Sequence, residues 1–102
     1  MITNVGFEAG HRLLQTKKDL LLFDVREEEE YITGHAENAV LFTLDTISAD
    51  SAAELIPDYA TPVMVYCRTG RRSKEAAARL AALGYTEIYD LGGLIGWPYG
   101  LE

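Results

Sequence analysis

Cysteine is almost absent from this chain, which contains Cys67 and no other. A single thiol cannot close an internal disulfide, so the sequence lacks the disulfide framework of many small secreted domains. The two histidines, His11 and His35, lie far from Cys67 in the sequence and complete no metal-ligand spacing with it. We therefore expect no disulfide, no metal site and no cofactor, and a thiol that stays free unless it reacts.

Basic residues and long apolar runs are also scarce. Lys and Arg number 9 against 16 Asp and Glu, a formal net charge of -7, and the resulting field repels nucleic acid and anionic membranes. No apolar run approaches the length of a membrane span, and Met1 to Gly10 lack the features of a signal peptide. We expect a cytoplasmic protein that binds neither nucleic acid nor membrane; a signal peptide removed earlier is the open alternative.

Nothing divides the 102 residues into separate parts, because the chain has no internal repeat, low-complexity tract or linker. Hydrophobic residues make up 48% and charged residues 25%, as in ordinary globular domains. The length suits one core, so we expect a single domain spanning residues 1–102. Leu101 and Glu102 are typical of a cloning remnant, and no expectation rests on them.

Short apolar runs alternate with helical segments along the chain. Each run is too short for a helix and unbroken by polar residues, which is typical of strands buried on both faces. The pattern predicts an α/β fold with a central, mostly parallel sheet and helices on both faces. Strands are expected at 20–23, 39–42, 63–66 and 87–89, and helices at 7–15, 27–32, 48–56 and 73–83.

Cys67 directly follows the predicted central strand at 63–66, and ligands of parallel sheets bind beyond the carboxyl ends of strands. A short loop containing Gly70 then leads to a helix that Ser73 can cap. Backbone N–H groups of such a loop, together with the helix N-terminus, favour a bound anion and the thiolate form of the cysteine. Four cations follow the thiol closely: Arg68, Arg71, Arg72 and Lys74.

The plain alternative is that Cys67 merely packs in the core, since free cysteines are among the most buried residues. The arginine-rich loop favours the reactive interpretation. Neither His11 nor His35 lies in a pattern that would orient it as a base for the thiol.

Four stretches, taken in order, resemble the rhodanese (sulfurtransferase) family in its single-domain form. The resemblance covers about residues 7–97, and one turn at 36–39 departs from the segment that the family often carries there. The stretches are Leu22–Glu27 with Tyr31, Gly34–His35 with Ala39, Cys67–Ser73, and Tyr89–Gly93 with Trp97.

This resemblance implies a rhodanese-like three-layer fold and a two-step reaction. Cys67 takes the outer sulfur of a small anionic donor such as thiosulfate, becomes a persulfide, and passes the sulfur to cyanide or to a thiol or protein acceptor. The residues implied to cradle the substrate are Arg68, Thr69, Gly70, Arg71, Arg72 and Ser73. Either Arg71 or Arg72 would clamp the donor, Ser73 is also a candidate donor to the persulfide, and Asp24, Arg26 and His35 would support the loop.

Two other functions compete with thiosulfate turnover. A sulfur-carrier or regulatory module would relay the same persulfide between proteins, and the sequence does not separate this from small-molecule turnover. A phosphatase or arsenate reductase is disfavoured, because related loops place five residues between the cysteine and the arginine. Here only four residues separate Cys67 from Arg72, and Ser73 stands at the required position.

Overall fold

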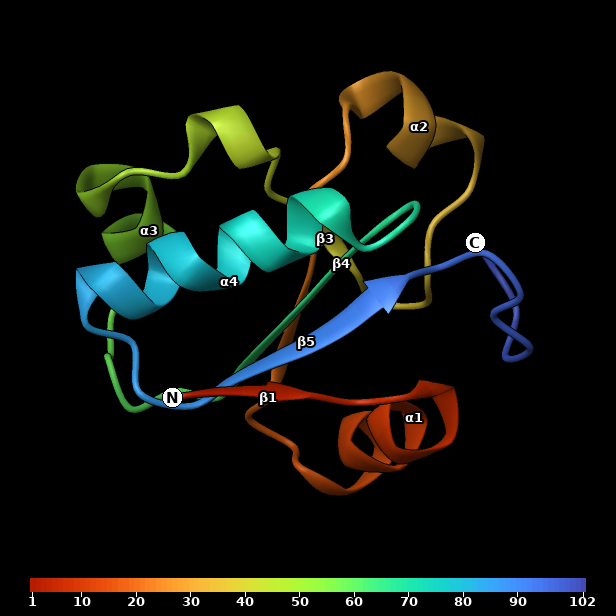
Figure 1. The fold of residues 1–102 in the computed structure, drawn as a ribbon, viewed down its shortest axis with the longest axis horizontal. Coiled ribbons are helices and arrows are strands. Elements are labelled where there is room, and N and C mark those ends of the chain that lie inside the picture. Colours follow the sequence, from red (N-terminus) through yellow and green to blue (C-terminus); the bar gives the residue numbers. More distant parts are fainter.

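Five parallel strands form one central sheet in the computed structural model, which describes residues 1–102 (Figure 1). Their spatial order is β1-β5-β4-β2-β3, and every neighbouring pair is parallel. The expected α/β class and parallel sheet are therefore confirmed. The strands are β1 (Ile2–Asn4), β2 (Leu21–Asp24), β3 (Val40–Leu41), β4 (Val63–Cys67) and β5 (Ile88–Gly93).

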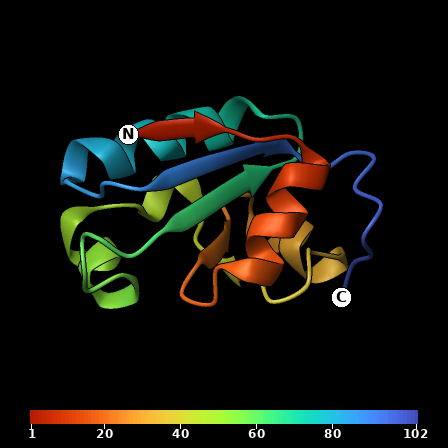
Figure 2. The ribbon, with the colours of Figure 1, turned by 90° about the horizontal axis from the view of Figure 1, so that it is seen from below.

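Helices cover both faces of this sheet, giving the expected three layers. Figure 2 shows α1 on one face and α4 on the other. A short 3₁₀ turn (Leu44–Thr46) precedes α3, and none of the helices is long and apolar enough to span a membrane. The helices are α1 (Phe7–Thr16), α2 (Glu28–Thr33), α3 (Ala49–Leu55) and α4 (Arg71–Leu83).

Two apolar cores lie on either side of the sheet, because successive residues of a buried strand point to opposite faces. The larger core joins β2 and β4 to α3 and α4, and contains Val63, Val65 and Cys67. The smaller core contains Met64 and Tyr66 from the same strand, with parts of α1 packed against it. Strand β4 is buried along its whole length, so the backbone that carries Cys67 is held from both faces.

Three local expectations were wrong. Strand β1 is not among the expected strands, because its three residues are exposed and form a strand only through pairing with β5. Ser73 does not cap the helix after the loop: Gly70 is the N-cap, with φ 100°, and α4 begins two residues earlier than expected. Glu75 consequently lies beyond the first turn and pairs with Arg79 instead. The last strand also continues to Gly93 rather than ending at Tyr89.

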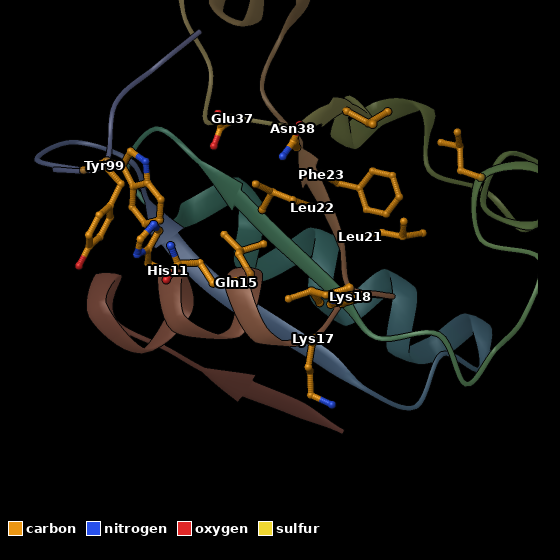
Figure 3. A pocket seen from close by; sticks show the side chains of 15 residues that line it. His11, Gln15, Lys17, Lys18, Leu21, Leu22, Phe23, Glu37, Asn38 and Tyr99 are labelled. Carbon is orange, nitrogen blue, oxygen red and sulfur yellow. The ribbon is translucent and has the colours of Figure 1, made fainter.

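The largest cavity of the molecule, about 540 Å³, lies away from the cysteine loop (Figure 3). Leucines of α1 and β2 line it together with Trp97 and Tyr99, whose ring stacks on His11 at 3.7 Å between centroids. None of the residues from Cys67 to Ser73 reaches this cavity, and no thiol or hydroxyl nucleophile of the serine or threonine type lines it. The site of cysteine chemistry is therefore elsewhere.

Candidate functional site

Cys67 is the last residue of β4, where the sheet ends and the chain turns toward α4. The turn is tight because Gly70 adopts a left-handed conformation, φ 100° and ψ -10°, that most side chains disfavour. This geometry directs the Gly70 N–H back to the thiol, and it donates to Cys67 Sγ at 2.9 Å. A hydrogen bond from a backbone N–H stabilises negative charge on the sulfur it reaches.

Further N–H groups of the loop are free to bind an anion. They precede or begin α4, where the first N–H groups of a helix have no partner inside the helix, and none has an acceptor elsewhere in the protein. The helix dipole adds positive potential at the same place. These free donors belong to Arg68, Thr69, Arg71, Arg72 and Ser73.

The loop rests directly on the end of β5. Leu94 N–H donates to the carbonyl oxygens of Cys67 at 2.9 Å and Arg68 at 3.1 Å. Gly93 lies so close to the loop that a Cβ atom there would stand 2.5 Å from the Arg68 carbonyl oxygen and 2.8 Å from Thr69 Cα. Gly93 belongs to one of the four stretches that carry the family resemblance, but the sequence predicts no contact between it and the loop. The only signal was the glycine pair itself.

The side chain of Arg72 is held by Glu30, a residue of the helix expected at 27–32 for which the sequence predicts no part in the site. Arg72 Nη1 donates to Glu30 Oε1 at 2.6 Å and Nη2 to Oε2 at 3.0 Å, a bidentate pair. This pair lowers the pKa of Glu30 to about 2 and raises the pKa of Arg72. Of the two predicted clamp residues, Arg72 is thus already engaged, whereas Arg71 has no carboxylate partner.

Three other cations that follow Cys67 in the loop and the first turns of α4 are exposed and unpaired: Arg68, Arg71 and Lys74. They surround the start of α4 in a protein whose overall charge is negative. The local field at the loop is therefore positive while the long-range field is not. Ser73, in contrast, is fully buried and donates its hydroxyl to the Gly70 carbonyl oxygen at 3.2 Å, so it braces the loop from inside.

The thiol itself lies beneath the surface. Cys67 is 0% exposed and belongs to the larger apolar core, which agrees in part with the plain interpretation of a packed cysteine. What distinguishes it is the polar contact from Gly70 and the free N–H groups around the same turn.

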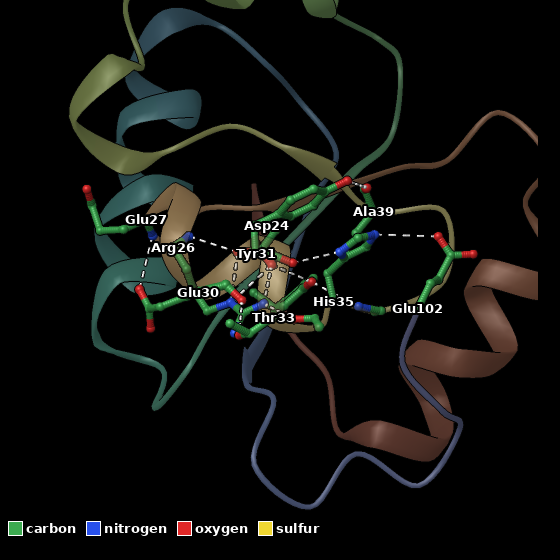
Figure 4. Close-up of polar contacts among 12 residues, drawn as sticks. Asp24, Arg26, Glu27, Glu30, Tyr31, Thr33, His35, Ala39 and Glu102 are labelled. Carbon is green, nitrogen blue, oxygen red and sulfur yellow. Dashed lines mark hydrogen bonds and ion pairs between the residues drawn. The ribbon is translucent and has the colours of Figure 1, made fainter.

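Asp24 and Arg26, two of the three predicted supporting residues, form one buried network (Figure 4). Arg26 Nη2 donates to Asp24 Oδ2 at 2.7 Å and to the Gly34 carbonyl oxygen at 2.7 Å. Tyr66, next to Cys67, donates its hydroxyl to the same Asp24 oxygen at 2.7 Å and accepts the Ala36 N–H at 3.1 Å. Burial and the Asp24 contact raise the pKa of Tyr66. The network joins β2, β4 and the turn after α2 below the loop.

His35, the third predicted supporting residue, lies outside that network. Its ring stacks on Tyr31 with centroids 3.8 Å apart, and its Nδ1 lies 2.9 Å from the Tyr31 carbonyl oxygen. Its Nε2 is 3.5 Å from a carboxylate oxygen of Glu102, and the His35 backbone pairs with Glu102. His35 therefore braces α2 against the end of the described chain and does not contact the thiol loop.

Replacing Tyr66 by Phe should destabilise the fold, because the Ala36 N–H loses its buried partner and Asp24 loses one donor. A buried group left unsatisfied costs about 1–3 kcal/mol, and we expect a fall of that size in the free energy of unfolding measured in urea. Tyr59→Phe is the control, since Tyr59 is 57% exposed and its hydroxyl makes no hydrogen bond. Equal stabilities of the two variants would contradict the role assigned to Tyr66.

The Glu30–Arg72 pair should make the free energy of unfolding depend on pH in the acidic range. The ordinary pKa of Glu30 is 4.5 and the folded value is about 2, so its contribution is complete above pH 4.5 and is lost as the pH falls toward 2. The difference in unfolding free energy between the natural chain and Glu30→Gln should stay constant above that window and shrink within it. Denaturant titrations at several pH values measure this. A difference that does not change with acid would show that the carboxylate charge is irrelevant.

A free cysteine at the carboxyl end of a central parallel strand, beside a turn with free N–H donors, is an arrangement suited to cysteine chemistry on an anion. The chain belongs to the family of rhodanese-like domains, whose profile matches residues 8–98. The resemblance inferred from the four sequence stretches is thereby confirmed. Membership supports a sulfurtransferase type of function.

Among curated proteins, the chain is 41% identical over 105 residues to the tRNA uridine(34) hydroxylases of Chlamydia muridarum and Chlamydia trachomatis. The match covers 97% of this chain but only 31% of those proteins, so the chain spans less than a third of the relatives' length.

Solved structures show the same fold. The rhodanese-like domain of an Anabaena protein superposes with a TM-score of 0.86 at 20% identity, covering 100% of this chain and 80% of that one. A rhodanese with anions from E. coli gives 0.72 at 31% identity, covering 81% and 96%. A human single-domain sulfurtransferase gives 0.73 at 23% identity, covering 88% of each chain.

Proposed function

We propose that this protein is a sulfurtransferase that takes sulfane sulfur from thiosulfate or a similar anionic donor. The Cys67 thiolate attacks the outer sulfur, a new S–S bond forms at Sγ, and the donor's own S–S bond breaks so that its electron pair leaves with sulfite. Cyanide or a thiolate then attacks the terminal sulfur, and the pair of the Cys67 persulfide bond returns to Sγ. Two half-reactions through one covalent form give ping-pong kinetics.

The observation that carries this proposal is the thiol's position under free donors. Gly70 N–H already reaches Sγ, and five further N–H groups of the turn lack acceptors. Donors fixed in place before the reaction stabilise the negative sulfur of the persulfide without reorganising. Arg68 and Arg71, exposed and unpaired, can meet the charge of an entering donor. The fold and the 31% identity to the E. coli rhodanese support the same chemistry.

The direct test mixes purified protein with thiosulfate and cyanide and measures thiocyanate and sulfite. We expect turnover with parallel lines in double-reciprocal plots, and an intact mass that gains one sulfur atom after thiosulfate alone. A chain that neither turns over nor gains sulfur would refute the proposal. Because Cys67 is buried, we also expect a small donor to load the thiol faster than a bulky alkylating reagent modifies it.

A second candidate is a relay or catalytic module that acts within or beside a larger protein. It is favoured by the curated relatives, which are named as RNA-modifying enzymes and which the chain matches over 31% of their length. In this role the Cys67 persulfide would pass to a protein thiol rather than to a small molecule. Loading with thiosulfate but no turnover with cyanide or glutathione, together with sulfur transfer to a partner protein, would favour the relay.

A further inference from the structure

The charges around Cys67 fall into two groups. Arg68 and Arg71 are exposed and have no carboxylate partner, whereas Arg72 has both of its terminal nitrogens on Glu30. Glu30 is itself fixed, because Oε1 also accepts the Glu27 N–H at 3.0 Å in the capping box that starts α2. The structure therefore places one immobile carboxylate beside the cationic loop.

Glu30 lies within electrostatic reach of the reacting sulfur. Arg72 connects them: its guanidinium binds Glu30, and Arg72 lies in the first turn of α4, two residues after Gly70, whose N–H reaches Cys67 Sγ at 2.9 Å. The pair is about one-third exposed, with side-chain accessibilities of 31% and 28%, so solvent screens it only in part. A donor anion at Cys67 would experience repulsion from Glu30 across a single guanidinium group.

This repulsion grows with the charge of the donor. A dianion such as thiosulfate interacts with a neighbouring charge twice as strongly as a monoanion of similar shape in the same position. Thiosulfonates are monoanionic donors that offer the same outer sulfur. Attack by the Cys67 thiolate forms the same persulfide, and the pair of the broken S–S bond leaves with a sulfinate instead of sulfite, so the two donors differ chiefly in charge.

We propose that Glu30 is a specificity-determining residue, which offsets the charge of Arg72 and lowers the preference of the site for doubly charged donors over singly charged sulfane-sulfur donors. The proposal rests on the sulfur transfer proposed above and adds the class of donor. Arg68, Arg71 and the free N–H groups bind the donor, while Glu30 limits how much negative charge they accept. Glu30 acts through Arg72 and does not touch the sulfur.

The test compares thiosulfate with methanethiosulfonate, using cyanide as acceptor at low ionic strength. We expect Glu30→Gln to raise the ratio of kcat/KM for thiosulfate to kcat/KM for methanethiosulfonate about 5- to 10-fold, a step typical of one added charge interaction in a partly screened site. Glu29→Gln is the matched control. This variant removes the same charge from the same helix, at an exposed residue that makes no ion pair. Its ratio of kcat/KM for thiosulfate to kcat/KM for methanethiosulfonate should equal that of the unsubstituted chain.

The double variant Glu30→Gln/Arg72→Gln separates charge from structure. It removes both charges of the pair, so the local charge balance is restored and the ratio should return toward the natural value. If Glu30→Gln lowers kcat/KM by the same factor for both donors, the proposal is overturned, since Glu30 would then have only a structural role. If Glu29→Gln raises the ratio of the two kcat/KM values as much as Glu30→Gln does, the proposal is also overturned, because the effect would then come from the long-range field of the protein. If the natural chain forms no persulfide with either donor, the proposed function fails instead.

Discussion

Cys67→Ser should abolish sulfur transfer while leaving the fold intact. The serine hydroxyl can still accept the Gly70 N–H that Cys67 Sγ accepts at 2.9 Å, so the turn keeps its hydrogen bond. It cannot form a persulfide, because an alcohol at neutral pH is neither as nucleophilic as a thiolate nor able to bind sulfane sulfur reversibly. We expect kcat to fall by at least about 10³-fold, the loss typical of removing a nucleophile. The thiocyanate assay and the intact mass after thiosulfate measure this.

Folding of this variant needs its own check, because the hydroxyl enters an apolar, fully buried position. The cost should be about 1–3 kcal/mol, which circular dichroism and urea unfolding will quantify. Cys67→Ala serves as the second variant, since it adds no polar atom to the core. If both folded variants still turn over thiosulfate and cyanide faster than the uncatalysed reaction, Cys67 is not the nucleophile and is only a packed core residue.

Local patterns were sufficient to predict where the candidate nucleophile lies in the fold. The buried run at 63–66, the thiol after it and Gly70 within the turn are adjacent in sequence, and the physics that joins them acts over a few residues. The same holds for the alternation of strands and helices, which follows from burial of apolar runs on both faces of a parallel sheet. The proposed reaction comes from the family resemblance, because periodicity alone does not define a reaction.

Contacts between distant segments were not predicted. Glu30 and Arg72 are separated by 42 positions, and no local pattern distinguishes Glu30 from the three glutamates before it. Only the packing of α2 beside the start of α4 selects it. Strand β1 was missed for a related reason, since its pairing with β5 defines it and its exposed residues carry no apolar signal. Serine is a good N-cap residue, so the local pattern predicts Ser73 as the cap, but Gly70 with its positive φ occupies that position and α4 begins earlier.

The packing of the Cys67–Gly70 loop on the end of β5 is another contact between distant segments. It leads to the second prediction of a large loss of activity. Gly93→Ala should disable transfer by displacing the loop. The new Cβ would stand 2.5 Å from the Arg68 carbonyl oxygen, 2.8 Å from Thr69 Cα and 2.9 Å from Thr69 C, all backbone atoms that have no rotamer to change. The loop must therefore move relative to Cys67. Misplacement of a catalytic group by about 1 Å costs on the order of 10²-fold, and we expect kcat/KM for thiosulfate to fall by about that factor.

Gly10→Ala provides a matched control. Its Cβ would also meet an atom at 2.5 Å, but that atom is the end of the Leu91 side chain, which can rotate, and Gly10 lies in α1 on the face away from α4. Both variants crowd the structure and should lose at most about 1–3 kcal/mol of stability, yet only Gly93→Ala should lose activity. If both variants keep full activity, the backbone of the loop is free to adjust, and its donors are not held in place by β5. If both lose activity in proportion to stability, the effect is general destabilisation, and the contact between Gly93 and Arg68 has no special part in positioning the sulfur site.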